Sequence, residues 1–260
     1  MFKFEYQEID FSHKLDNATS PEDEYTKHMH AFVEILFFVS GDVVYNVEGE
    51  KRKMKPGNLV FIRPGKLHLA EVNREVLYER YVLKFPESMI PRHMRSYFYN
   101  SIPFFHLSQE ATKIFDALDQ FYQFVDDQDM KTICQSKLLE LLVTLKNCNT
   151  KEPKFEQSPV VVEIINYIQN HLEENLSLSK ISKDLSYSES YISSYFKKEM
   201  HAPIMKYIRT KKIIYAHTLI TEGEKPYDVS ERLHFNDYST FYRQYVKVVG
   251  MAPSSLPRKK

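Results

Sequence analysis

Three histidines and one glutamate in the first third of the chain have side chains of the kinds that bind divalent metals. His28, His30 and Glu34 are separated by even numbers of residues, and His68 follows after Gly57 and Pro64. Imidazole nitrogens and carboxylate oxygens are ligands that zinc and its neighbours accept. Side chains alternate along a strand, so the first three share a face if the strand is regular. The set predicts a divalent-metal site, a polar effector pocket or satisfied structural histidines, and these three readings stay open.

A second set of reactive side chains lies on the predicted outward faces of two short helices near the C-terminus. The set consists of Ser190, Ser193, Ser194, Lys197, Tyr238, Ser239, Tyr242 and Arg243. Arginine suits guanine edges, lysine suits phosphate, and serine and tyrosine suit either bases or phosphates. A solvated helix surface is the alternative interpretation of each helix taken alone.

An internal repeat positions this second set. Residues 181–188 align with residues 229–236, and each half contains a short helix, a tight turn and an N-cap candidate, Ser188 or Asn236. A second helix follows in each half, which is the order of a helix-turn-helix unit. The residues predicted to pack inward are Ile192, Tyr195, Phe196, Phe241, Tyr245 and Val248. Two units in tandem favour DNA binding over a solvated helix pair.

From about residue 177 to residue 253 the chain resembles the DNA-binding domain of the AraC/XylS family of transcription regulators. The matching positions are 178–182, 188–199, 207–209, Ala216, 229–235, Phe241, Arg243, Tyr245, Gly250 and Pro253. The resemblance implies two units joined by a long helix, over residues 204–221, that contact successive major-groove segments. It also places every member of the second set except Lys197 at a base-facing position.

The chain departs from that family at a few positions. Ser186 and His234 stand at the turns where glycine is usual, and a side chain there must tolerate a strained backbone. Ile214 and Tyr215 replace charged residues of the long helix, and Val246 replaces a common lysine.

Residues 1–85 have the pattern of a small β-structure. Apolar runs at 34–39, 43–47, 59–62 and 78–85 are separated by turn residues, which predicts a sandwich or barrel. Residues 25–85 resemble the two cupin motifs, although Arg63 stands where proline is common. The resemblance implies a barrel that in some members holds iron, manganese, nickel or zinc through the positions of His28, His30, Glu34 and His68. Members of the AraC/XylS family often carry such a barrel, and many bind a small organic effector in it.

Two amphipathic helices are predicted between the barrel and the tail, around residues 114–125 and 133–145. The apolar stripe formed by Leu138, Leu141, Leu142 and Leu145 predicts a homodimer interface, with burial against the chain's own barrel as the alternative. Residues 151–159 are polar, contain two prolines and predict a linker. We therefore expect an effector-binding and dimerisation domain over residues 1–150 and a DNA-binding domain over residues 158–260.

The composition is that of a folded protein without a membrane segment. Of the 260 residues, 43% are hydrophobic and 27% are charged, and no run of about 18 apolar residues occurs. The net charge is zero, but Lys and Arg exceed Asp and Glu after residue 158, which suits a polyanionic partner for the tail. Cys134 and Cys148 predict no disulfide, and with the missing signal segment they favour the cytoplasm.

The sequence thus predicts an α+β protein, with a cupin-like barrel and helical hairpin followed by an all-α domain of two helix-turn-helix units. The expected function is that of an AraC/XylS-type regulator without catalytic residues, controlled by a small effector bound in the barrel. The expected partners are double-stranded DNA, that effector, a second copy of the chain and RNA polymerase, and a divalent metal is the one candidate cofactor. The alternative is a metal-dependent cupin enzyme with a helical appendage, which leaves the tandem units unexplained.

Overall fold

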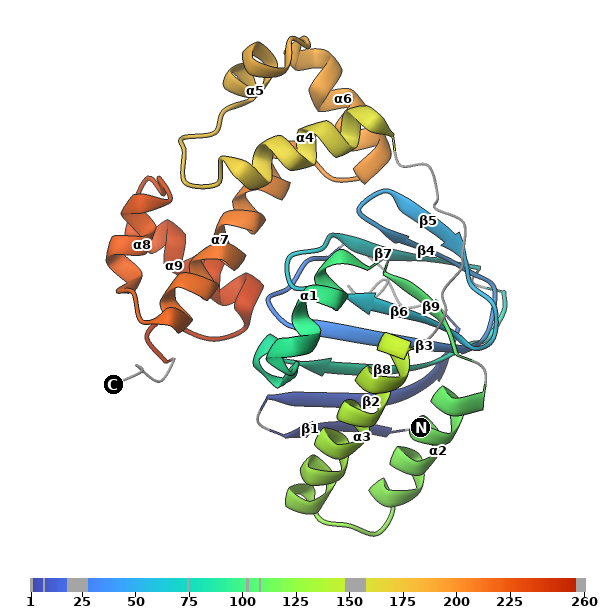
Figure 1. Cartoon of the computed structure of the whole chain (residues 1–260). Coiled ribbons are helices and arrows are strands. Elements are labelled where there is room, and N and C mark those ends of the chain that lie inside the picture. The colour runs from blue at the N-terminus through green and yellow to red at the C-terminus, as the bar shows by residue number, and fades with distance from the viewer. Residues whose placement is uncertain are drawn as a thin grey trace.

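A sheet-rich part comes first in the chain and an all-helical part follows it (Figure 1). The computed structural model describes residues 2–6, 8–17, 28–73, 75–101, 103–107, 109–147 and 158–255. The predicted α+β fold class is confirmed. Cys148 and nearly all of the predicted linker over residues 151–159 lie outside the described residues.

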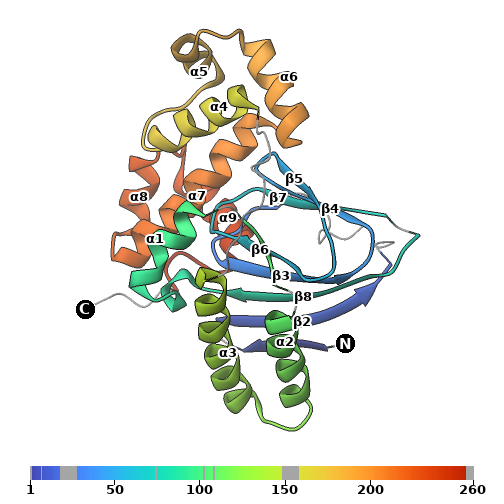
Figure 2. The same cartoon turned by 45° about the vertical axis from the view of Figure 1, so that its right-hand side comes forward.

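Two antiparallel sheets form the first part. The larger sheet has the order β1 (Phe2–Tyr6), β2 (Ile9–Asp16), β8 (Tyr78–Phe85), β3 (Val33–Ser40), β6 (Asn58–Ile62) and β9 (Phe104–His106). The smaller sheet has the order β5 (Glu50–Lys53), β4 (Val43–Val47) and β7 (His68–Val72). The four apolar runs of the sequence form β3, β4, β6 and β8, as predicted. The two sheets curve around a shared apolar interior, so this part is a small barrel (Figure 2).

Strand β3 is buried on both faces, which explains why its sequence is almost continuously apolar. Leu36 and Phe38 point into the barrel interior between the two sheets. Ile35 and Phe37 point the other way, into the core beneath the helices. Glu34 shares the face of Leu36 because side chains alternate, so its carboxylate points into the barrel.

The outer face of the larger sheet is covered by α1 (Arg92–Asn100), α2 (Gln109–Tyr122) and α3 (Asp127–Asn147), with a short 3₁₀ turn, η1 (Glu87–Met89), before them (Figure 2). The predicted helical hairpin is present as α2 and α3. The prediction for its leucine stripe was wrong, because Leu138, Leu141, Leu142 and Leu145 are all at most 2% exposed within this chain's own core. The larger sheet covers that stripe, and the large apolar side chains of α3 that stay exposed are Leu139 and Val143.

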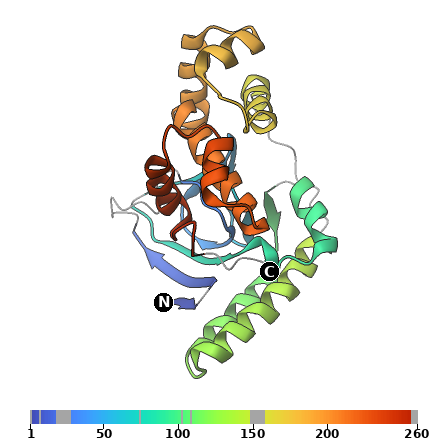
Figure 3. The same cartoon turned by 90° about the vertical axis from the view of Figure 1, so that its left-hand side faces the viewer.

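The second part consists of α4 (Pro159–Asn170), α5 (Leu178–Leu185), α6 (Glu189–Met200), α7 (Ile204–Glu222), α8 (Pro226–Arg232) and α9 (Tyr238–Val249). Helix α7 matches the predicted long helix and contributes to two apolar cores, one with α4–α6 and one with α8 and α9. The buried Lys212 ammonium on α7 donates to the carbonyls of Glu174 and Leu233, and so joins the two units. The hairpin of α2 and α3 lies at the opposite end of the molecule from α4–α6 (Figures 1 and 3). None of the described helices is long and apolar enough to cross a membrane.

Candidate functional site

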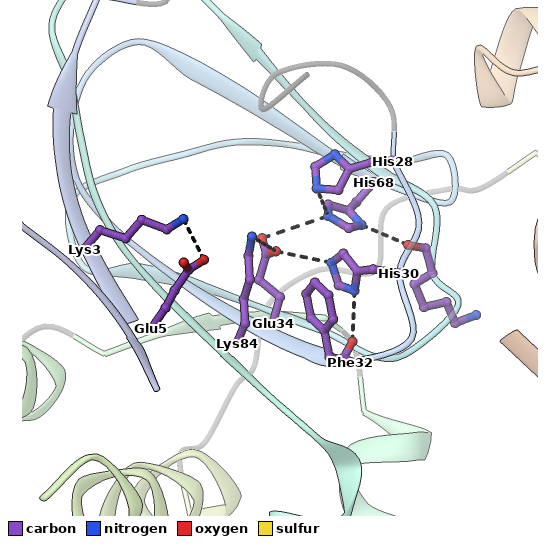
Figure 4. Close-up of polar contacts among 9 residues, drawn as sticks. Lys3, Glu5, His28, His30, Phe32, Glu34, His68 and Lys84 are labelled. Carbon is purple, nitrogen blue, oxygen red and sulfur yellow. Dashed lines mark hydrogen bonds and ion pairs between the residues drawn. The ribbon is translucent and has the colours of Figure 1, made fainter. Parts of the chain in front are cut away.

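The four predicted metal ligands meet inside the mouth of the barrel, as Figure 4 shows. One nitrogen or oxygen atom from each of His28, His30, Glu34 and His68 lies within 4.8 Å of the others. His28 Nε2 is 2.9 Å from His68 Nε2, and His30 Nε2 is 3.2 Å from a Glu34 oxygen. The strand assumed for the first three residues is not regular, because residues 31 and 32 form a bend before β3 begins. The cluster forms nonetheless, since that bend returns Glu34 to the side of the histidines.

Backbone carbonyls hold two of the histidine rings in place. His30 Nδ1 donates to the carbonyl of Phe32 at 3.0 Å, and His68 Nδ1 donates to the carbonyl of Lys66 at 2.9 Å. With the proton on Nδ1, each ring turns the lone pair of its Nε2 toward the centre of the cluster. This outer hydrogen bond is the support that histidine ligands of metals usually have.

Burial fixes the charge states of this cluster. His68 is 1% exposed and Glu34 is 3% exposed. Burial lowers the pKa of His68 to about 3, so its ring is neutral at neutral pH, which is the form that binds a cation. Burial alone would raise the pKa of Glu34, but the contacts with His30, His68 and Lys84 together outweigh it, hold that pKa well below its usual range and keep the carboxylate ionised. The Lys84 ammonium lies 4.0 Å from a Glu34 oxygen and supplies one positive charge to this carboxylate. A proton or a metal ion between Glu34 and the imidazole lone pairs would add another.

A cavity of about 60 Å³ adjoins the cluster inside the barrel. His28 and Glu34 form one wall, and Tyr45, Arg80 and Lys84 contribute the others. Arg80 is 3% exposed, and its guanidinium donates to Asp16 at 3.0 Å. The sequence analysis did not predict Arg80. Tyr78 and Val82 lie two residues before and after it in β8, and their side chains face the barrel interior, so the Arg80 side chain faces the interior as well. A charged residue at an inward-facing position of a strand was the signal that could have identified Arg80 as a pocket residue.

The two helix-turn-helix units are built around left-handed turns. Ser186 has φ 59° and His234 has φ 58°, so both side chains occupy the conformation that favours glycine, as the departures at these positions implied. Ser188 caps α6 by accepting from the Tyr191 amide, as predicted. The cap predicted at Asn236 was wrong by one residue, because Asp237 accepts from the Thr240 amide.

The predicted outward residues of the two second helices are exposed, with one exception. Ser190, Ser193, Ser194 and Lys197 on α6 and Ser239, Tyr242 and Arg243 on α9 are exposed, whereas Tyr238 is half-buried. The Tyr238 ring packs against Phe241 and Tyr227. The Ser194 hydroxyl donates to the Ser190 carbonyl at 2.6 Å, so only its acceptor side is available to a partner.

The inward set packs as predicted at its centre. Ile192, Phe196, Phe241 and Tyr245 are each 0% exposed, and Tyr195 and Val248 are partly buried. The polar faces therefore sit on helices whose opposite faces are fixed by two apolar cores.

Two family models match the two parts of the chain. The model described as an AraC-like ligand binding domain matches residues 15–142, and the model described as a helix-turn-helix domain matches residues 181–259. The chain belongs to the AraC-type family of transcription regulators.

Curated relatives support this membership over most of their length. The chain is 23% identical over 249 residues to an uncharacterized HTH-type transcriptional regulator, YdeC of Bacillus subtilis, covering 88% of this chain and 84% of the relative. It is 27% identical over 235 residues to a second regulator of that organism, YobQ, covering 88% of this chain and 87% of the relative.

The chain can also be superposed on a solved structure, that of ToxT from Vibrio cholerae. The match covers 95% of this chain and 96% of ToxT, with 11% identity and a TM-score of 0.39.

This AraC-type regulator therefore binds DNA through its helical part and a small-molecule ligand through its barrel. The alternative of a metal-dependent enzyme has no support, since the relatives are named as transcription regulators. Besides Arg80, sequence reasoning missed a buried contact between barrel and helices at Glu48, whose partners are Tyr207 and Lys211. No local pattern marks such a contact, because its residues come together only when the two parts dock.

Proposed function

We propose that this AraC-type regulator reads double-stranded DNA with the outward faces of α6 and α9. The residues proposed for contact are Ser190, Ser193, Ser194, Lys197, Tyr238, Ser239, Tyr242 and Arg243. One observation carries the proposal: two helices of 12 residues each, both N-capped and both preceded by a left-handed turn, pack against opposite ends of α7.

The outward faces of α6 and α9 carry different side chains, so we propose different DNA contacts for them. Arg243 offers a planar fork that suits a guanine edge. Lys197 and Tyr242 suit phosphate oxygens, and the serines suit bases or phosphates at short range. We also propose a cytoplasmic location, because the DNA of bacteria lies in the cytoplasm.

Selection from a random duplex library, followed by titration at several salt concentrations, tests the DNA proposal. We expect an enriched motif and an affinity that falls steeply as salt rises, because phosphate contacts release counterions. Enrichment of no motif, together with binding that is independent of salt, would contradict it.

We also propose that the effector site is the cluster of His28, His30, Glu34 and His68, and that a divalent transition-metal ion is a ligand there. Donors that share one such ion lie about 3 Å apart when bond lengths are near 2.1 Å. The 2.9 Å and 3.2 Å separations in the cluster fit that spacing, and the 4.0 Å between His68 Nε2 and a Glu34 oxygen would have to shorten when the ion binds. The bound ion would add a positive charge between Glu34 and the imidazole lone pairs, and it would hold the rings together.

Native mass spectrometry with element analysis of the full-length chain tests the metal proposal. We expect near-stoichiometric metal in the wild type and its loss in His30→Ala and Glu34→Gln. His93→Ala is the matched control, because His93 is an exposed histidine on α1. Affinity for zinc should fall as pH falls, since protons compete for the same lone pairs. A metal-free wild type that also takes up no added zinc would sink this proposal and direct the search to organic anions for the cavity beside Arg80.

We further propose that two copies of the chain pair through the outer face of α3. This proposal replaces the leucine stripe with Leu139 and Val143, which are one helical turn apart and 45% and 46% exposed. Sedimentation velocity should show a dimer for the wild type and a monomer for the double variant Leu139→Glu/Val143→Glu. Contact with RNA polymerase is the remaining proposed partnership, and co-purification with the polymerase on bound DNA tests it.

A further inference from the structure

The two segments that hold the histidine ligands, residues 28–31 and 65–68, have a second face that points out of the barrel. His28 and His68 exchange two backbone hydrogen bonds of 3.2 Å, and the Gly65 amide donates to the His30 carbonyl at 2.9 Å. Met29 and Leu67 alternate with the ligands and therefore point the opposite way. Both are buried in the apolar core formed by helices α4–α7, so the back of the ligand cluster is a docking surface for the DNA-binding domain.

A buried polar contact closes the same surface. Glu48, in the turn between β4 and β5, is 6% exposed. One of its oxygens accepts from the Tyr207 hydroxyl at 2.9 Å and lies 3.1 Å from the Lys211 ammonium, both on α7. Its other oxygen pairs with the Lys66 ammonium. Burial alone would raise the pKa of Glu48, but Lys211 and Lys66 lower it to about 2, so the contact is ionic at neutral pH.

Lys66 connects this contact directly to the ligand cluster. Its side chain binds the Glu48 carboxylate, while its backbone carbonyl accepts the hydrogen bond that orients the His68 ring. The Glu48 amide also donates to the carbonyl of Leu67 at 2.8 Å. A single residue, Lys66, thus connects the Glu48 carboxylate to a ligand ring.

Helix α7 fits closely against the same segment. A Cβ added to Gly65 would lie 3.5 Å from Ile214, so the loop and the helix are in van der Waals range. Ile214 is 8% exposed and belongs to the shared core. The docking surface therefore explains why an isoleucine stands where the family resemblance implies a charged residue.

We propose that occupancy of the His28–His30–Glu34–His68 cluster and docking of α7 on the barrel are thermodynamically coupled, with Glu48, Tyr207 and Lys211 as the contact that transmits the effect. The inference rests on the proposed effector site and adds its route of regulation. Docking holds segments 28–31 and 65–68 in the geometry that brings the ligand atoms together. The docked form therefore binds a metal ion more tightly than the undocked form, and by linkage the ion strengthens docking by the same factor.

The type of contact supports this role. A buried ion pair adds little net stability, because desolvation offsets the attraction between its charges, but breaking one partner leaves a buried charge unpaired. Such a contact distinguishes two arrangements sharply. Loss of docking leaves α4–α9 tethered to the barrel only through the chain, and so changes how freely the two units can align on DNA.

Hydrogen exchange and zinc titration of the full-length chain test the coupling separately from the metal proposal. The variants are Tyr207→Phe and Lys211→Met, which touch none of the four ligands. Tyr215→Phe and Lys206→Met are the matched controls on the same helix, since Tyr215 bonds Glu173 within the helical part and Lys206 is exposed. In the metal-free chain we expect faster exchange in segments 28–32 and 64–69 for the first two variants alone, with peptides of α3 unchanged.

The same variants should bind zinc at least about fivefold more weakly than the wild type, which is the lower end of typical coupling between sites. Zinc should in turn slow exchange in the first half of α7 in the wild type. Unchanged exchange in both segments, or exchange that rises equally in α3, overturns the coupling. If the wild type takes up no zinc while exchange in the two segments rises, the metal proposal fails and the coupling to metal occupancy fails with it. The exchange result then shows only that docking orders the two ligand segments.

Discussion

The two helix-turn-helix units share their local geometry and differ in what lies behind them. Their turns have almost the same backbone angle, at Ser186 and His234, and their second helices have the same length. Behind the first unit, the core of α4–α7 also takes in Met29 and Leu67 of the barrel. Behind the second unit, the core contains residues of α7, α8 and α9 and their connecting loops. The comparison shows that repeated units can keep one fold while only one of them is joined to the sensor.

The largest expected difference between the units comes from removing a central ring. Phe196→Ala and Phe241→Ala should each destabilise their unit by about 3–5 kcal/mol, because both rings are 0% exposed. Only Phe196→Ala should also speed hydrogen exchange in barrel segments 28–32 and 64–69, because its ring contacts that of Tyr207. If Phe241→Ala opens those barrel segments as well, the two units are not independent in the way proposed here.

Acid should release the first unit from the barrel and leave the core of the second unit intact. The carboxylate of Glu48 has its pKa lowered from 4.5 to about 2, so its stabilising effect is complete above pH 4.5 and is lost as the pH falls toward 2. Hydrogen exchange in the first half of α7, corrected for the intrinsic rate, should rise over this range.

Glu48→Gln is the control for that pH dependence, since its side chain cannot ionise while Lys66, Lys211, Arg63 and Tyr207 remain around it. The variant should show a much flatter profile than the wild type. Profiles that are parallel in the two proteins would assign the acid sensitivity to other groups.

The units should also differ in how strongly single side chains read DNA. Arg243→Ala should cost roughly 1–3 kcal/mol of binding free energy and relax the base preference at one position. Ser193→Ala on the first unit should cost less, about 0.5–1.5 kcal/mol, because a neutral hydrogen bond contributes less than a charged bidentate contact. Titration on the selected duplex measures both, with Lys137→Ala on α3 as a control for lost positive charge. Equal losses for the two variants would remove the distinction.

The smallest expected effect concerns the shared turns. Ser186→Gly and His234→Gly should each stabilise their unit by up to about 1 kcal/mol, because glycine relieves the left-handed strain but gains entropy in the unfolded chain. The two gains should be nearly equal, since the φ angles are 59° and 58°. Alanine at the same positions should give no gain, and local hydrogen exchange provides the readout.

The sequence contained most of what is local in this structure. The apolar runs at 34–39 and 78–85 predicted strands because their side chains fill a two-sided core, and the repeat in the tail predicted both helix-turn-helix units. Helix α1 and strand β9 were not predicted, because the buried residues of α1 are Met94 and Phe98 alone, which is a thin helical pattern, and β9 has three residues. The cap at Asp237 lay one residue from the predicted Asn236, since either side chain can accept from the first turn.

What the sequence did not contain is the identity of packing partners. The stripe at Leu138 and Leu142 was correctly apolar, but periodicity does not say whether a sheet or a second subunit covers it. The ligand set from His28 to His68 was visible as a spacing of residue types. The docking contact at Glu48 was not, because its partners on α7 lie about 160 residues away in the chain and follow no local pattern.

Helix α7 has a consequence for the DNA itself. Its 19 residues give it a length of roughly 28 Å, close to the pitch of about 34 Å that separates successive turns of the major groove. Two recognition helices packed at its opposite ends, and joined by the buried Lys212, cannot change their separation freely. The base pairs read by one unit should therefore lie about ten base pairs from those read by the other. Inserting five base pairs between them turns the second site to the far side of the duplex, where a single copy of the chain can no longer reach both.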